Sequence, residues 1–340
     1  NNTTGTRNIA IGYGALDAAD DEDDNLAIGY DALGGSIAGG EYNVAIGNYV
    51  LDANTSGDYN VALGNQAMGS NTTGESNLAI GHVALGSNTT GNYNVGVGQS
   101  ALNGNTTGLR NTSLGYGALD APDTENDNLA IGYEALGGSI AGGEYNAAVG
   151  NYALDALTSG DGNTGAGYNA MTALTTGSGN VSLGRASGTT ITTGSNNTVI
   201  GKGADVSANS GTNQIVIGQG ATGHGDNIAV IGNGSATAIH PHDNNEVDLG
   251  SSSYKFKNLH LAGSAIVGVA TVSSDATFNG SENIIAVNTS SGTVRITIDT
   301  DQLVSGRTLI IKKISGGNAV YINTEGSEKL NAGTNVNLDQ

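Results

Sequence analysis

The fold is decided by residues 43–64, which read NVAIGNYVLDANTSGDYNVALG. The stretch begins and ends with the same motif: Asn, an apolar residue, Ala, a second apolar residue and Gly. Between two copies of this motif most units carry a small–large pair, such as Ala84-Leu85, and a turn, such as Thr55-Ser56-Gly57. Gly and Asn suit the positive-φ corners of a tight coil. The stretch therefore predicts one turn of a repeating structure.

The motif recurs along the first two thirds of the chain. Its glycines stand at positions 12, 29, 47, 64, 81, 98, 115, 132, 150, 167, 184, 201, 218 and 232. Most intervals are 17 residues, two are 18, and the last is 14. Residues 11–53 also match residues 114–156 at 35 of 43 positions. The two ranges are 103 residues apart, the length of six units, which indicates that a block of six units was copied. Such periodicity is typical of a repeat architecture, which lengthens by whole units without changing its cross-section.

A 17-residue unit is too short for a two-helix repeat, which needs about 33 residues. It suffices for two short strands and two turns. Alternation in Val44-Ala45-Ile46 places Val and Ile on one face and Ala on the other. The recurrent Asn is expected to form a ladder of side-chain amides along one corner, as in stacked cross-β assemblies. Residues 1–233 are thus predicted to form an all-β, parallel β-solenoid of about 14 coils, on the order of 65 Å long.

One coil of this size buries little apolar surface, and a stack of coils leaves wide apolar faces. The many Ala and Gly residues allow close approach of another chain. We therefore expect lateral association of identical chains. That the number of chains is three rests partly on a resemblance to a known family.

The Asn-Val-Ala-Ile-Gly units resemble the head repeats of trimeric autotransporter adhesins over residues 1–233. The resemblance implies a homotrimer of left-handed parallel β-rolls. Those heads favour a 14-residue repeat, so the longer unit here implies one enlarged turn.

After Gly232 the repeat stops, and residues 234–264 are expected to be a connector. Its segment 247–263, VDLGSSSYKFKNLHLAG, resembles a linker of bacteriophage tail fibres, where it precedes trimeric modules. Residues 265–340 are expected to form a small all-β domain, with strands near 284–287, 293–298, 308–314 and 319–323. Their order resembles small β-sandwich modules of viral fibres, in which further strands follow.

These resemblances imply a structural and adhesive fibre component on a virion surface or otherwise extracellular. Its partners would be itself as a homotrimer, other fibre or baseplate proteins, and a host-surface glycan or protein. The alternatives are a trimeric bacterial surface adhesin, and a glycan-cleaving tailspike. The adhesin would continue into a coiled-coil stalk and a membrane anchor, and no heptad pattern is present.

Charge and composition exclude several other classes. The chain carries 31 acidic and 11 basic residues, a net charge of −20, which disfavours a nucleic-acid partner. It has no Cys, so disulfides and thiol chemistry are excluded. The chain contains no run of about 18 apolar residues, so the sequence predicts no membrane-spanning segment.

Two candidate metal sites follow from the sequence. The first is His240 with His242, which the fibre resemblance places on a threefold axis, where three chains would give six imidazoles to one transition-metal ion. The competing interpretation is a surface turn beside Pro241 and Asp243. The second is Ca²⁺ at two acidic turns, residues 20–24 and 123–127, which lack the ligand spacing of an EF-hand. A solvated charged turn is the alternative there.

Other side chains suggest binding more than catalysis. A Tyr after the motif Gly could stack on sugars, or cover a coil edge, and occurs as Tyr13, Tyr30, Tyr116, Tyr133 and Tyr168. Thr-Thr-Gly corners could form an ice-binding array, although these Thr residues lie next to a turn glycine. His82, His224 and His260 are isolated, and no acid is placed opposite a nucleophile. We therefore expect no enzymatic activity.

Overall fold

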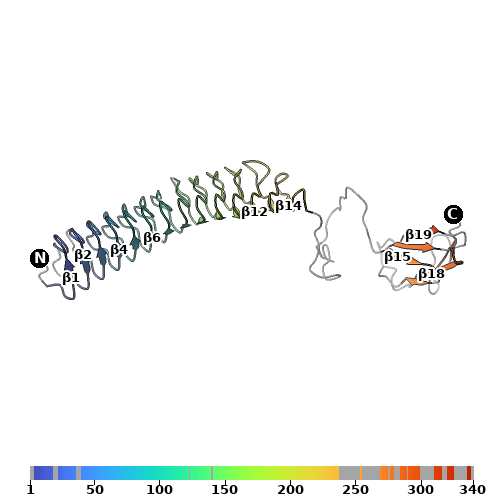
Figure 1. Ribbon diagram of the computed structural model, residues 1–340, viewed down its shortest axis with the longest axis horizontal. Helices are drawn as coiled ribbons and strands as arrows, with labels where there is room; N and C mark the ends of the chain where they lie inside the picture. Colours follow the sequence, from blue (N-terminus) through green and yellow to red (C-terminus); the bar gives the residue numbers. More distant parts are fainter. Residues whose placement is uncertain are drawn as a thin grey trace. The chain divides into compact units, whose positions relative to one another are not determined.

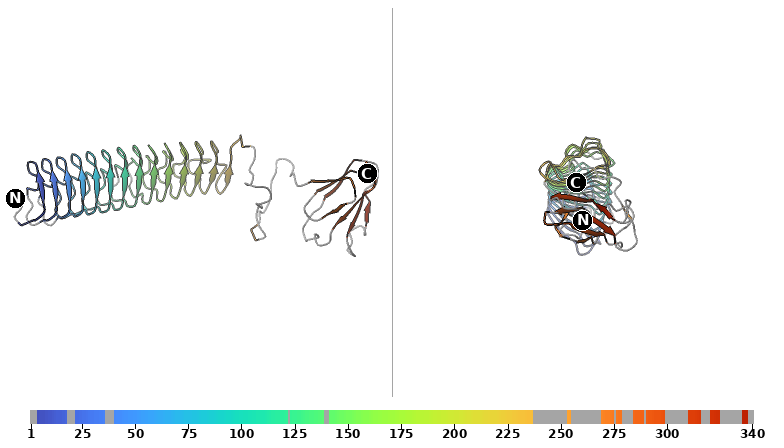
Figure 2. Two further views of the ribbon diagram at one scale, coloured as in Figure 1. Left: turned by 60° about the horizontal axis from the view of Figure 1, so that its bottom comes forward. Right: turned by 90° about the vertical axis from the view of Figure 1, so that its right-hand side faces the viewer.

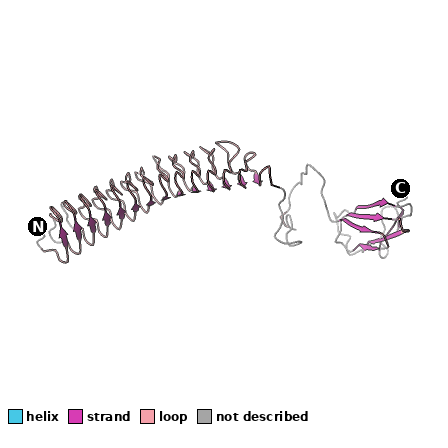
Figure 3. Cartoon of the chain, in the orientation of Figure 1, coloured by secondary structure: helices cyan, strands magenta, loops and turns pink. Residues whose placement is uncertain are grey.

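The computed structural model describes residues 4–17, 22–35, 40–121, 123–138, 141–236, 253–254, 269–274, 276–278, 284–288, 290–298, 310–315, 320–324 and 335–337. None of these residues is in a helix, which confirms the all-β class (Figure 3). The chain divides into two units, Asn1–His240 and Pro241–Gln340.

The first unit is a parallel β-solenoid, as predicted (Figures 1 and 2). One three-residue strand per coil joins a 14-stranded sheet in sequential order. Equivalent positions pair, for example Val61 with Leu78 and Ala62 with Ala79. The strands are β1 Ile9–Ile11, β2 Leu26–Ile28, β3 Val44–Ile46, β4 Val61–Leu63, β5 Leu78–Ile80, β6 Val95–Val97, β7 Thr112–Leu114, β8 Leu129–Ile131, β9 Ala147–Val149, β10 Thr164–Ala166, β11 Val181–Leu183, β12 Thr198–Ile200, β13 Ile215–Ile217 and β14 Ala229–Ile231.

The expectation of two strands per coil is wrong for the described coils. Outside the sheet the backbone turns through left-handed residues, and one coil has three of them: Tyr49 (φ 55°), Leu51 (φ 49°) and Tyr59 (φ 57°). A left-handed conformation costs a residue with a Cβ about 1–2 kcal/mol. Leu51 offsets this cost because its side chain is fully buried, which is worth about 1.5–3 kcal/mol. The corners are thus held by core packing as well as by Gly and Asn.

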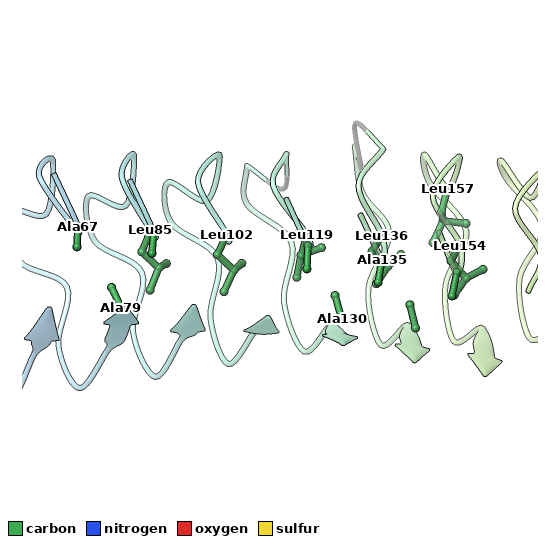
Figure 4. Close-up of a cluster of buried hydrophobic side chains, with 14 of the residues drawn as sticks. Ala67, Ala79, Leu85, Leu102, Leu119, Ala130, Ala135, Leu136, Leu154 and Leu157 are labelled. Atoms are coloured by element: carbon green, nitrogen blue, oxygen red, sulfur yellow. The ribbon is translucent and has the colours of Figure 1, made fainter. Parts of the chain in front are cut away.

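The core is a narrow column of small and medium-sized side chains. Figure 4 shows Leu85, Leu102 and Leu119 on successive coils, with Ala79 and Ala130 facing them from the strands. All five side chains have no exposed surface. The middle residue of a strand therefore points inward, and this position must be small because the coil is thin.

The predicted asparagine ladder is present, and it joins neighbouring coils. Asn94 is fully buried. Its Oδ1 accepts a hydrogen bond from the Asn111 backbone N–H (2.9 Å), and its Nδ2 donates to the Gly108 carbonyl (2.8 Å). A second ladder runs through Asn54, Asn71, Asn88 and Asn105, where each Nδ2 donates to the preceding Oδ1 at 2.8–2.9 Å. Both ladders satisfy polar groups that the stack removes from water.

The motif glycine is required by close contact between coils. Gly47 has φ 135°, and a Cβ added there would lie 2.6 Å from the carbonyl oxygen of Gly64. Only glycine lets the two backbones approach this closely.

The second unit contains two small sheets. One has the order β15 (Val269–Val272), β17 (Ile284–Asn288), β19 (Ile310–Ser315), and the other β16 (Ala276–Phe278), β18 (Val294–Ile298), β20 (Val320–Thr324), β21 (Asn335–Asn337). Each strand that the sequence predicted in this region overlaps one of β17–β20. Successive strands alternate between the sheets up to β20, and all pairs are parallel except β20 with β21. The chain therefore winds between two sheets, whereas sandwiches are commonly antiparallel.

Candidate functional site

The outer surface of the long sheet carries two rows of aliphatic side chains, formed by the first and third residues of strands β2–β13. We call it the aliphatic face. Most of these residues are Val, Ile or Leu, and they point away from the core because the middle residue points into it. Ile80, Leu114 and Leu183 remain 38%, 47% and 52% exposed. Rows of apolar side chains of this kind are typical of interaction sites.

Tyrosines form a second feature on the coil surface. Tyr13 stacks on Tyr30 with ring centroids 5.4 Å apart, and Tyr116 stacks on Tyr133 at 5.2 Å. Tyr168, the fifth predicted residue, forms an edge-to-face contact with Tyr152, with ring centroids 6.1 Å apart. Stacking along the coils covers ring faces that a sugar would need, and leaves ring edges and hydroxyls exposed.

The sequence analysis missed part of this surface. Tyr49 and Tyr152 extend the first row although each lies two residues after its motif Gly. A further row lies directly before the motif Asn, where Tyr42 and Tyr59 stack at 5.0 Å with nearly parallel rings. The sequence contains a signal for this row, because its tyrosines recur directly before the motif Asn and so keep the same 17-residue spacing.

At the acidic turns, most of the described carboxylates accept hydrogen bonds from arginine side chains or backbone N–H groups. Arg7 Nε donates to Asp24 at 2.6 Å, and Arg110 Nε donates to Asp127 at 2.6 Å. These hydrogen bonds lower the pKa of Asp24 and of Asp127. Glu125 is buried, and its carboxylate accepts hydrogen bonds from backbone N–H groups. The turns therefore serve as joints between coils.

The described residues give no support to either predicted metal site. Among them, no three His, Cys, Asp or Glu side chains gather closely enough to hold a metal ion. His240 and His242 lie outside the described residues, as do Asp20 and Asp21. Both metal sites therefore stay predictions.

The first threonine of a Thr-Thr-Gly corner is hydrogen-bonded within the solenoid. Thr72 Oγ1 donates to the Thr89 carbonyl of the next coil at 3.0 Å, and Thr89 Oγ1 donates onward to Thr106 in the same way. These hydroxyls stabilise the stack and are not free to order water into an ice-like array.

Two carboxyl groups of the coils are unusual. Burial raises the pKa of Asp52 and of Asp120. The two residues occupy the same position in coils four steps apart, about 19 Å at the strand spacing. Paired carboxyls in glycosidases lie about 5–9.5 Å apart, so these two do not form such a pair.

No helix among the described residues is long and apolar enough to cross a bilayer. Comparison with protein-family models, with curated proteins and with solved structures gave no match for this chain.

Proposed function

We propose that this protein is a structural and adhesive fibre component of a virion, in which three identical chains with left-handed coils associate through the aliphatic face. The fibre would be extracellular, joined to other fibre or baseplate proteins, and would carry a surface that meets a host glycan or protein. The observation that supports this proposal is the aliphatic face itself.

A surface of this kind is costly to leave in water. Complete burial of one Val, Leu or Ile side chain is worth about 1.5–3 kcal/mol. The aliphatic face carries such residues on almost every coil. Most of them are half-buried by their neighbours, and the most exposed of them, Leu183, keeps 52% of its surface in water. A partner with the same 17-residue spacing matches it along its whole length, and a second copy of the chain has that spacing by construction.

A trimeric bacterial adhesin would use the same face, so the face alone does not separate the two functions. The resemblance of residues 247–263 to tail-fibre linkers favours the virion. Immunogold electron microscopy with antibodies against the chain distinguishes them: labelled fibres on virus particles support the proposal, and labelled cells without particles favour the adhesin. Among the described residues, the two carboxyls with a raised pKa, Asp52 and Asp120, do not form the pair that a glycan-cleaving spike would need.

The decisive experiment is the solution mass of the intact chain by light scattering. We expect a mass near three times 33.7 kDa. Replacing Leu78 and Ile80 by Lys should give monomers. Because the chain has a net charge of −20, two added lysines make it less negative and so do not increase the overall repulsion between chains. The control replaces Glu75 and Ser76, both exposed in the same region, by Lys. A monomeric natural chain would overturn the proposal.

The same measurement with a strong chelator addresses the metal. Loss of the trimer in chelator would support a transition-metal ion held by His240 and His242, and an unchanged mass would argue against it.

A further inference from the structure

A groove crosses four neighbouring coils on the turn side of the solenoid, away from the strands. It is open to solvent, has a volume of about 350 Å³, and runs past Gly69 and Gly86 between Asp52 and Asn103. This volume lies at the small end of the range found for ligand sites. At the strand spacing the groove extends over about 14 Å.

The groove exists because a side chain is missing from one row. The fifth residue after each motif glycine stacks along the solenoid, and in these coils the row reads Asp52, Gly69, Gly86, Asn103. Gly69 leaves open space where the preceding coil carries a side chain, whereas Gly86 is covered by the Asn103 amide, whose Oδ1 lies 2.6 Å from the place that a Cβ would take. A Cβ at Gly69 would meet only the Tyr49 and Gln66 backbones at 3.4 Å or more. Gly69 is therefore not required by close packing, unlike the motif glycines.

Polar groups line this space. Gln66, Ser70 and Ser87 offer amide and hydroxyl groups that both donate and accept hydrogen bonds. No described residue donates a hydrogen bond to the Asp52 carboxylate, whose pKa is raised by burial and by the charge of Asp31. Val83 adds an apolar patch to the wall.

The copied block shows the same position in a filled form. Asp155 corresponds to Asp52, and Thr172 stands where Gly69 stands. Thr172 Oγ1 donates a hydrogen bond to Asp155 Oδ1 at 2.6 Å. A hydroxyl thus occupies the place beside the carboxylate in one block, and the same place is open in the other.

We propose that the groove at Gly69 binds a short, uncharged oligosaccharide, one hydroxyl of which donates to the Asp52 carboxylate as Thr172 does to Asp155. The remaining amides and hydroxyls of the groove would pair with further sugar hydroxyls, and Val83 would contact a C–H face. Uncharged sugars are favoured because the acidic chain repels anions. This inference rests on the adhesive role proposed above and gives that role a site.

Saturation-transfer difference NMR on the intact protein tests the proposal with maltotriose, cellotriose and mannotriose as probes, and sialyllactose as the acidic comparison. We expect saturable transfer to at least one neutral trisaccharide and none to sialyllactose. Gly69→Thr should abolish the transfer, because its hydroxyl fills the groove. The control Asn65→Thr changes an exposed residue of the same coil and should leave the transfer unchanged.

A reciprocal variant, Thr172→Gly, frees Asp155 and should strengthen the transfer from the natural protein. No transfer to any neutral probe, or equal transfer in Gly69→Thr, would overturn the inference. If light scattering still shows a trimer in that case, only the groove assignment fails. A monomer that retains the transfer would instead overturn the assembly and leave the groove in place.

Discussion

The carboxamide of Asn94 links its coil to the next at two points, because its Oδ1 accepts the Asn111 N–H at 2.9 Å while its Nδ2 donates to the Gly108 carbonyl at 2.8 Å. Replacement by Ala would leave the buried Asn111 N–H without a partner, and would leave the Gly108 carbonyl with only its hydrogen bond from Asn105 Nδ2 at 3.2 Å. An unpaired buried backbone group costs about 1–3 kcal/mol, so we expect Asn94→Ala to lower the free energy of unfolding by about 1–3 kcal/mol. Urea denaturation followed by circular dichroism measures the loss. Asn65→Ala, at an exposed amide, is the control, and equal losses in both variants would contradict the role of the ladder.

Two glycines one coil apart should respond differently to the same methyl group. Gly47→Ala places a Cβ 2.6 Å from the Gly64 carbonyl in a left-handed backbone, whereas the Cβ of Gly69→Ala meets ordinary contacts at 3.4 Å. We expect Gly47→Ala to lower the thermal midpoint strongly. Gly69→Ala should leave it unchanged or raise it, since Ala reduces the entropy of the unfolded chain by about 0.4–1 kcal/mol. A comparable loss in both would show that the motif glycines are not set by coil contact.

The left-handed backbone of the buried leucines should change the usual order of stability between Ala and Gly variants. Leu85 is fully buried with φ 50°, and Leu85→Ala should cost about 2–5 kcal/mol. In an ordinary strand Gly would cost about 0.5–1 kcal/mol more than Ala. Here Leu85→Gly relieves about 1–2 kcal/mol of backbone strain, so it should be no worse than the Ala variant. Chemical denaturation of the two variants side by side decides this order, and a clearly less stable Gly variant would refute it.

Asp52 gives a prediction about pH. Burial raises its pKa, so the folded chain retains this proton to higher pH than the unfolded chain does. The ionised carboxylate therefore lowers stability above the folded-state pKa, and the penalty disappears below the unfolded-state pKa of about 3.9. We expect Asp52→Asn to raise the thermal midpoint at pH 7 and to leave it unchanged near pH 3. Glu75→Gln, at an exposed carboxylate, serves as the control, and a gain at pH 3 equal to that at pH 7 would rule out ionisation as the cause.

The solenoid could be predicted because its determinants are periodic. Gly47 and Asn94 belong to rows in which each residue meets its own equivalent in the next coil, so a pattern in sequence becomes a contact in space. The single strand per coil could not be predicted, because it depends on Leu51 and its equivalents adopting a backbone conformation that Leu rarely takes. Burial of the leucine side chain in the core offsets the cost of that conformation.

The candidate sites were harder to predict for a related reason. The row that holds Tyr13 and Tyr30 was recognised in the sequence, since both keep the 17-residue register, but the stacking of their rings on one another was not predicted. The groove depends on Gly69, which looks like an ordinary turn residue until the row to which it belongs is known. His240 and His242 lie outside the repeat, so no periodicity fixes their surroundings.

The ladder hydrogen bonds run along the solenoid axis, and this direction determines how the unit responds to force. A pull on one chain end loads only the bonds between the last coil and its neighbour, since each coil holds the next. Coils should detach one at a time, and each releases 17 residues, or about 56–61 Å of extended chain. Single-molecule stretching of this unit would then give evenly spaced steps, with the repeat length of the sequence appearing as a mechanical period.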